Sequence, residues 1–124
     1  MTGPEQHDSV AAYGAAWLAT DDRERLALLE QAWASDGVYC DPLTLVAGRE
    51  ALAAHIAQTQ ASLAGGRVEV TSAPARHHDS ALFHWRITDA AGATVLTGLD
   101  VVQVDDAGRI RRLTGFFDEA PATG

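Results

Sequence analysis

The sequence predicts an α+β domain in which three helices precede a mostly antiparallel sheet. Apolar residues recur at helical spacing through the first half of the 124-residue chain and alternate with period two through the second half. Short clusters of Gly, Asp and Ser separate the alternating segments, as expected of turns between neighbouring strands. Helices placed before the strands, rather than between them, indicate an α+β architecture.

The first two helices are expected to pair as a hairpin. Asp8 or Ser9 can cap a helix that ends near Ala19 and carries on one face Val10, Tyr13 and Trp17. Asp21 followed by Glu24 is typical of the start of a second helix. Its expected apolar stripe, before residues 35–37 stop it, is Leu26, Leu29 and Trp33.

A short strand and a third helix should follow. Residues 38–41 read as a strand that Pro42 ends, and period two puts Tyr39 and Asp41 on the same face. The third helix is expected from Gly48 to residues 65–66, with one side formed by Leu52, His55, Ile56, Thr59 and Leu63.

The rest of the chain predicts an antiparallel meander. Four strands are expected at residues 67–76, 81–88, 94–104 and 109–117, with turns at 77–80, 89–92 and 105–108. The second of these strands places on one face Ala81, Phe83, Trp85 and Ile87. We expect one domain over residues 1–124, with an ordered core at about 8–118 and loose ends at 1–6 and 119–124.

Composition excludes several classes of function. The net charge is −8, so nucleic acid and anionic membrane surfaces should repel the chain. The sequence has no lysine, which excludes Schiff-base chemistry, and phosphate-binding or dinucleotide-binding glycine motifs are absent. No two of the five histidines stand four residues apart, which disfavours a metal site, and we expect no cofactor. Without an apolar segment of about 18 residues or an N-terminal leader, the chain is expected to be cytoplasmic.

Three polar residues could carry chemistry. Asp100 stands within strand 94–104 on the face of Leu96, Gly98, Val102 and Val104, where burial would favour its protonated form unless a partner is present. A structural aspartate is the equal alternative. Asp41 before Pro42 can be explained by a turn contact, and Tyr13 by core packing, so neither is specific by itself.

Together these residues resemble a known site. A Tyr in the first helix, an Asp before Pro in the first strand and an Asp within the long fourth strand follow the order seen in the ketosteroid isomerases. Over about residues 8–118 the sequence is similar to the nuclear transport factor 2-like superfamily, which includes SnoaL-like polyketide cyclases. The resemblance implies a cone-shaped, curved sheet on three helices, a cystatin-like fold that encloses an apolar pocket.

The resemblance also implies roles for individual residues. Asp41 would be the base that moves a proton between carbons, while Tyr13 and protonated Asp100 would donate hydrogen bonds to the enolate oxygen. The substrate would be a small hydrophobic molecule, and superfamily members of this kind commonly form homodimers. The expected pocket-lining residues are Trp17, Tyr39, His55, Phe83, Trp85, Phe116 and Phe117.

One departure and one alternative stay open. The isomerases often place tyrosines around the catalytic Tyr, whereas the third helix of this chain offers His55, which could replace that hydrogen bond, act as acid or base, or pack in the core. The alternative to an isomerase or cyclase is a non-catalytic module of the same fold that binds a ligand or a partner.

Overall fold

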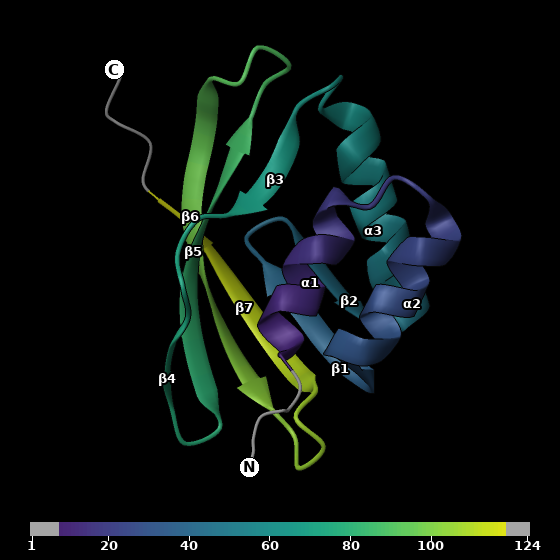
Figure 1. The fold of residues 1–124 in the computed structure, drawn as a ribbon, viewed down its shortest axis with the longest axis vertical. Helices are drawn as coiled ribbons and strands as arrows, with labels where there is room; N and C mark the ends of the chain where they lie inside the picture. Colours follow the sequence, from purple (N-terminus) through teal and green to yellow (C-terminus); the bar gives the residue numbers. More distant parts are fainter. Residues whose placement is uncertain (1–7, 119–124) are drawn as a thin grey trace.

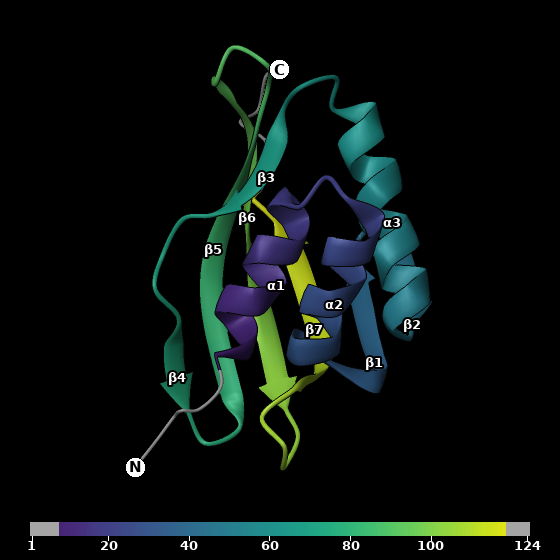
Figure 2. The same ribbon diagram turned by 45° about the vertical axis from the view of Figure 1, so that its right-hand side comes forward.

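The computed structural model describes residues 8–118, and in this range three helices lie against one face of a strongly curled, mixed sheet (Figures 1 and 2). The strand order is β2-β1-β7-β6-β5-β3, and β4 pairs with β5. The helices are α1 (Ser9–Leu18), α2 (Asp22–Ala32) and α3 (Arg49–Ser62). The strands are β1 (Trp33–Asp41), β2 (Thr44–Ala47), β3 (Arg67–Val70), β4 (Ala75–His77), β5 (Ser80–Thr88), β6 (Thr94–Val104) and β7 (Ile110–Phe117). The expected α+β class with three N-terminal helices is confirmed; the loose ends expected at 1–6 and 119–124 lie outside the described residues.

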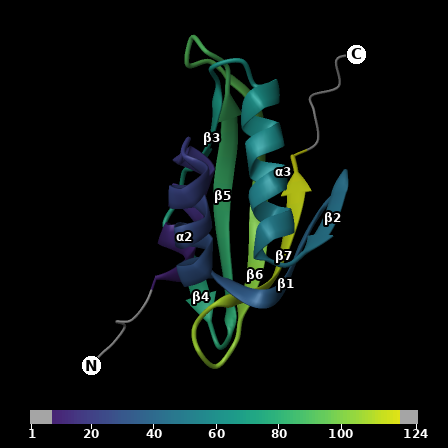
Figure 3. The same cartoon turned by 90° about the vertical axis from the view of Figure 1, so that its right-hand side faces the viewer.

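The three helices begin where the capping residues predict. The side chain of Asp8 accepts a hydrogen bond from the backbone N–H of Ala11 at the start of α1. Asp21 does the same for Glu24 at the start of α2, and Gly48, with φ +92°, precedes α3. Figure 3 looks onto α2 and α3 with the strands behind them. No helix within residues 8–118 has the length and apolar character needed to cross a membrane.

The boundary between α2 and β1 differs from the prediction. We expected Trp33 to end the apolar stripe of the second helix, but α2 ends at Ala32 and Trp33 is the first residue of a longer β1. Trp33 is fully buried and stacks on Tyr13, with ring centroids 5.8 Å apart. A Cβ at Gly37 would lie 2.5 Å from the Trp33 indole nitrogen, so residues 35–37 bend around this ring instead of ending a helix. Tertiary packing therefore overrides the helical spacing.

Two short strands were not predicted as they occur. β2 follows β1 through a tight turn at Pro42 and Leu43, and pairs with it antiparallel. The strand expected at 67–76 is divided into β3 and β4, because Pro74 has no N–H to give to a ladder. Between β3 and β4, the Ser72 hydroxyl accepts a hydrogen bond from the backbone N–H of His84. This bond holds the segment between the two strands against β5.

The remaining strands form the expected meander, and one pairing adds a parallel contact. β5, β6 and β7 pair antiparallel in sequence, and Asp100 lies between Phe83 on β5 and Gly115 on β7. β7 also pairs with β1 in parallel, with Tyr39 opposite Leu113. This second pairing brings the first strand of the chain beside the last one. The concave face of the resulting sheet and the helices enclose the apolar core.

A buried arginine connects the three helices. Arg25 of α2 is 2% exposed and donates hydrogen bonds to the Ala19 carbonyl after α1 and to Gln60 of α3, at 2.9 and 2.7 Å. Gln60 in turn donates to the carbonyls of Trp17 and Ala19. A buried cation is costly unless it is hydrogen-bonded, so Gln60 stabilises both Arg25 and the end of α1.

We predict that Gln60→Ala lowers the free energy of unfolding by about 2–3 kcal/mol, because it removes one of the hydrogen-bond partners of the buried Arg25 and the Gln60 donor to the carbonyls of Trp17 and Ala19. Urea denaturation of parent and variant measures this. Gln58→Ala is the matched control, since Gln58 is exposed on the same helix and should change stability by about 0.5 kcal/mol or less. Equal effects of the two substitutions would contradict the role of Gln60.

Candidate active site

A cavity of about 330 Å³ lies between the concave face of the sheet and helices α1 and α3. This volume is at the lower end of the range for small-molecule sites, about 300–1,000 Å³. Its wall is mostly apolar and aromatic, and its ionisable side chains are Tyr13, Tyr39, Asp41, His55 and Asp100. The other lining residues are Trp17, Leu43, Thr44, Thr59, Ser62, Leu63, Val68, Val70, Trp85, Ile87, Leu96, Gly115 and Phe117.

Asp41 lies at the end of β1 with both carboxyl oxygens engaged. Its Oδ2 accepts a hydrogen bond of 2.6 Å from the Tyr39 hydroxyl, and its Oδ1 accepts one of 2.8 Å from the backbone N–H of Leu43. The second contact is the turn interaction that the Asp-Pro sequence suggested. The first fixes the carboxylate relative to the cavity wall. Each oxygen has a second lone pair, so Asp41 can still accept a proton or another hydrogen bond.

Asp100 lies on β6 and is less accessible to water than Asp41. It is 6% exposed, and Oδ1 accepts a hydrogen bond of 3.1 Å from the indole N–H of Trp85. Burial raises the pKa of Asp100 to about 7; the Trp85 hydrogen bond opposes this rise and the charge of Asp41 adds to it. A substantial fraction of Asp100 is therefore protonated near neutral pH and can donate a hydrogen bond.

Two glycines lie beside the acids and make room for neighbouring side chains. A Cβ at Gly115 would lie 2.8 Å from Asp100 Oδ1 and 3.5 Å from the Cβ of Asp41, so this β7 glycine separates the two carboxyl groups. Gly115 could not be predicted from the sequence, because its place beside the two acids depends on the β1–β7 pairing. Gly98, on the same face of β6 as Asp100, makes room for the Trp85 ring, which lies 2.2 Å from where a Cβ would stand.

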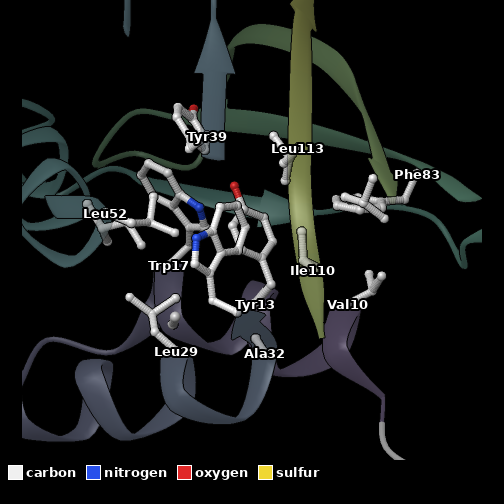
Figure 4. Packing of buried hydrophobic residues seen from close by; sticks show 14 of the residues in the cluster. Val10, Tyr13, Trp17, Leu29, Ala32, Tyr39, Leu52, Phe83, Ile110 and Leu113 are labelled. Atoms are coloured by element: carbon white, nitrogen blue, oxygen red, sulfur yellow. The ribbon is translucent and has the colours of Figure 1, made fainter. Parts of the chain in front are cut away.

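Tyr13 reaches the cavity from α1. Figure 4 shows its ring rising from the helix with the hydroxyl directed toward the sheet. The side chain is 2% exposed and packed between Trp33 and Phe83, and the Trp17 indole lies close to its hydroxyl. Burial, and then the nearby Asp100, raise the pKa of Tyr13 well above its usual range. Tyr13 therefore stays a neutral hydroxyl that can donate to a ligand.

His55 projects from α3 into the same cavity. Its ring contacts Trp17 edge-on and Tyr39 at a tilt, with centroids 5.8 and 5.1 Å apart. Burial lowers the pKa of His55, and the charge of Asp41 opposes that effect. The imidazole is therefore largely neutral at pH 7 and faces the ligand space without being part of the core cluster.

The structure brings together eight of the ten residues proposed from the sequence. Tyr13, Asp41 and Asp100 line one cavity, together with Trp17, Tyr39, His55, Trp85 and Phe117. Phe83 does not line it, because this fully buried ring lies behind Tyr13 in the core. Phe116 does not either: it alternates with Gly115 and Phe117, so its side chain is on the outer face and is 51% exposed. These two pocket assignments were wrong.

Several further lining residues were not predicted. Leu43 lies in the turn between β1 and β2 and Thr44 is the first residue of β2, a strand that was not expected after Pro42. Ile87 and Leu96 could have been found, because strand alternation already placed them on the concave face. Within residues 8–118, no three His, Cys, Asp or Glu side chains are grouped closely enough to hold a metal ion.

Comparison with known proteins identifies relatives of the same fold. The sequence pattern of the SnoaL-like domain family matches residues 10–113. A crystal structure of a protein from Agrobacterium tumefaciens, provisionally assigned as an isomerase of the SnoaL-like family, is 34% identical; the match covers 90% of this chain and 95% of that one, with a TM-score of 0.83. No curated protein matches the chain.

More distant structures share the fold. A protein from Sinorhizobium meliloti, provisionally assigned as a polyketide cyclase, is 22% identical over 90% of this chain and 95% of that one, with a TM-score of 0.69. A protein from Catenulispora acidiphila with a ketosteroid isomerase-like fold, solved in complex with trimethylamine, is 21% identical over 92% and 85% of the two chains, with a TM-score of 0.68.

We predict that Asp100 makes stability depend on pH. Its pKa is raised from an ordinary 3.8 to about 7 in the fold, so the proton stabilises the folded chain at low pH, and this contribution is lost as pH rises through about 7. Relative to Asp100→Asn, the parent should lose on the order of 4 kcal/mol between pH 4 and pH 8. Urea denaturation at several pH values measures the difference, and parallel pH curves would contradict the buried, protonated acid.

Proposed function

The chain belongs to the SnoaL-like domain family, and from this premise we propose that it is a cofactor-independent enzyme that moves a proton next to a carbonyl group in a small hydrophobic molecule. The observation that carries the proposal is the meeting of a carboxylate, Asp41, and two buried hydrogen-bond donors, Tyr13 and Asp100, in one apolar cavity. Proton abstraction beside a carbonyl needs a base and a group that stabilises the negative charge developing on oxygen. This cavity offers both.

The proposed step follows from the different surroundings of the two acids. A substrate carbonyl oxygen would accept hydrogen bonds from Tyr13 and protonated Asp100. Asp41 would take the adjacent carbon-bound proton, and the electrons of the broken C–H bond would form the enolate that the two donors stabilise. Return of the proton from Asp41 to another carbon would complete an isomerisation. Attack of the enolate carbon on a second carbonyl would instead give an aldol-type cyclisation, in which the oxygen of the attacked carbonyl takes the proton from Asp41 and becomes a hydroxyl.

The charge of the cavity supports a neutral substrate. Among the described lining residues, two are acids and none is an arginine, so an anionic substrate would meet repulsion without a compensating cation. The mostly apolar wall favours a hydrophobic skeleton. The names given to the A. tumefaciens and S. meliloti proteins, an isomerase and a polyketide cyclase, fit the two forms of this chemistry.

A second candidate function is ligand binding without chemistry. The C. acidiphila protein of similar fold holds trimethylamine, and aromatic rings beside a carboxylate can hold an alkylammonium ion through cation–π and ionic contacts. Trp17, Tyr39 and Asp41 offer these groups. Binding of such an ion without any proton transfer from a carbonyl compound would favour this candidate.

We predict that Asp41→Asn lowers kcat for a β,γ-unsaturated ketone by at least about 100-fold, with the ligand Kd nearly unchanged. The amide oxygen can accept from the Leu43 N–H and the amide NH2 can donate to the Tyr39 hydroxyl oxygen, so the side chain stays in place, but an amide does not take up a proton near neutral pH. Tyr13→Phe and Asp100→Leu should each cost roughly 2.7–4 kcal/mol of transition-state stabilisation, because each removes one donor to the enolate oxygen.

The measurements are turnover, by absorbance of the conjugated product, and Kd, by calorimetry. His55→Gln is the comparison for Asp41→Asn, since both alter an ionisable group of the same cavity. Normal turnover by Asp41→Asn would show that Asp41 is structural and would leave His55 as the candidate base. Absence of turnover in the parent with every carbonyl probe would favour the binding function.

We also propose that two copies pair through the outer face of the sheet, as the resemblance to the superfamily implies. A cross-strand row on this face joins Leu45, Cys40, Thr114, Val101 and Leu82. Phe116 lies opposite Leu99 in the next row and is half exposed. A mostly apolar row on a sheet face that no helix of residues 8–118 covers fits an association site.

We predict that sedimentation shows a parent mass near twice the chain mass of 13.1 kDa. Combined Phe116→Gln and Leu45→Gln substitutions should shift it toward the single-chain mass, because they remove exposed apolar area from the outer face. Leu18→Gln is the control, since Leu18 is also exposed but lies on α1. A single-chain mass for the parent would contradict the proposal.

A further inference from the structure

Trp85 makes the one hydrogen bond that a protein group gives to the Asp100 carboxyl within residues 8–118. Its indole Nε1–H donates to Oδ1 across 3.1 Å, and both side chains are buried. An indole N–H is a donor and never an acceptor. In a protonated carboxyl the carbonyl oxygen is the better acceptor, so this bond favours the form in which Oδ1 is the carbonyl oxygen and Oδ2 carries the proton.

The indole is held in this position from two sides. Gly98 lies opposite Trp85 on β6, and the ring occupies the place where a Cβ would stand, 2.2 Å from Cζ2. Phe117 contacts the other side edge-on, with ring centroids 5.8 Å apart. Such packing restricts the indole to one orientation, and a donor held in place is worth more to a site than a mobile one.

We propose that Trp85 is a positioning residue of the site, which occupies Oδ1 of Asp100 and thereby leaves Oδ2 as the proton-bearing oxygen that donates to a bound ligand. The sequence suggested a different role for Trp85, as a surface against which a substrate packs. The consequence for catalysis rests on the proposed function, in which Asp100 stabilises an enolate oxygen. The orientation of the carboxyl does not, because it follows from the hydrogen bond and the packing alone.

The chain contains a matched control. Trp33 is buried like Trp85, but its indole nitrogen has no hydrogen-bond partner in the described structure. Trp33→Phe and Trp85→Phe therefore make the same chemical change in two buried places, and one of them removes a hydrogen bond to Asp100. Differences between these variants report on that bond rather than on the loss of an indole.

The test is an NMR titration of the Asp100 carboxyl carbon in the parent and in both variants. The Trp85 hydrogen bond favours the charged carboxylate, so Trp85→Phe should raise the Asp100 pKa, and Trp33→Phe should leave it unchanged. A loosened structure that admits water would shift the pKa in the opposite direction. An unchanged or lower Asp100 pKa in folded Trp85→Phe would overturn the proposal.

Turnover supplies a second measurement. Trp85→Phe should lower kcat roughly tenfold, less than removal of Asp100 itself, and should move the alkaline limb of the pH profile upward. In the Trp85→Phe, Asp100→Leu double variant the loss should equal that of Asp100→Leu alone, because Trp85 acts through Asp100. Additive losses would overturn the role of Trp85 in catalysis. If the parent shows no proton transfer, the proposed function fails, while the titration still decides whether Trp85 orients Asp100.

Discussion

The parallel pairing of β1 with β7 is the constraint on which the candidate site depends. It places Asp41, Gly115 and Asp100 on three adjacent strands, with the glycine between the two acids. A side chain at position 115 would collide with Oδ1 of Asp100. The two carboxyl groups can therefore share a cavity because the strand between them has no side chain at position 115.

The two acids differ in hydration and hydrogen bonding. Asp41, which is half-buried, accepts two hydrogen bonds, one from the Tyr39 hydroxyl and one from the Leu43 backbone N–H. Asp100 accepts one from Trp85 and is nearly inaccessible to water, so burial dominates and its pKa rises. In the proposed proton transfer, the buried acid donates a hydrogen bond and the other carboxyl group accepts the proton. One fold supplies both environments across a single strand.

Local patterns predicted the parts of this site that depend on local geometry. Strand alternation was sufficient to put Asp41 with Tyr39 and Asp100 with Gly98, and helical spacing put Tyr13 with Trp17. Helical spacing could not show that Trp33 belongs to β1 rather than to α2, because this boundary depends on the packing of Trp33 against Tyr13 and Gly37. Strand alternation could not show that Phe83 lies outside the cavity, because it predicts which face a side chain is on but not how deeply the side chain is buried. Phe116 was assigned to the pocket together with Phe117, although strand alternation puts these two neighbours on opposite faces of the sheet.

The surroundings of Asp100 differ from those of other aspartates of this chain. Asp89 and Asp105 each accept hydrogen bonds from two backbone N–H groups in the turns between strands. There the carboxylate takes the place of the backbone carbonyls that these N–H groups lack. Asp100 lies in a regular strand whose backbone is already paired, and it accepts one side-chain donor. A leucine would satisfy the same strand pattern without the cost of burying a carboxyl group. Local rules are broken in this way most often where a protein acts on a ligand.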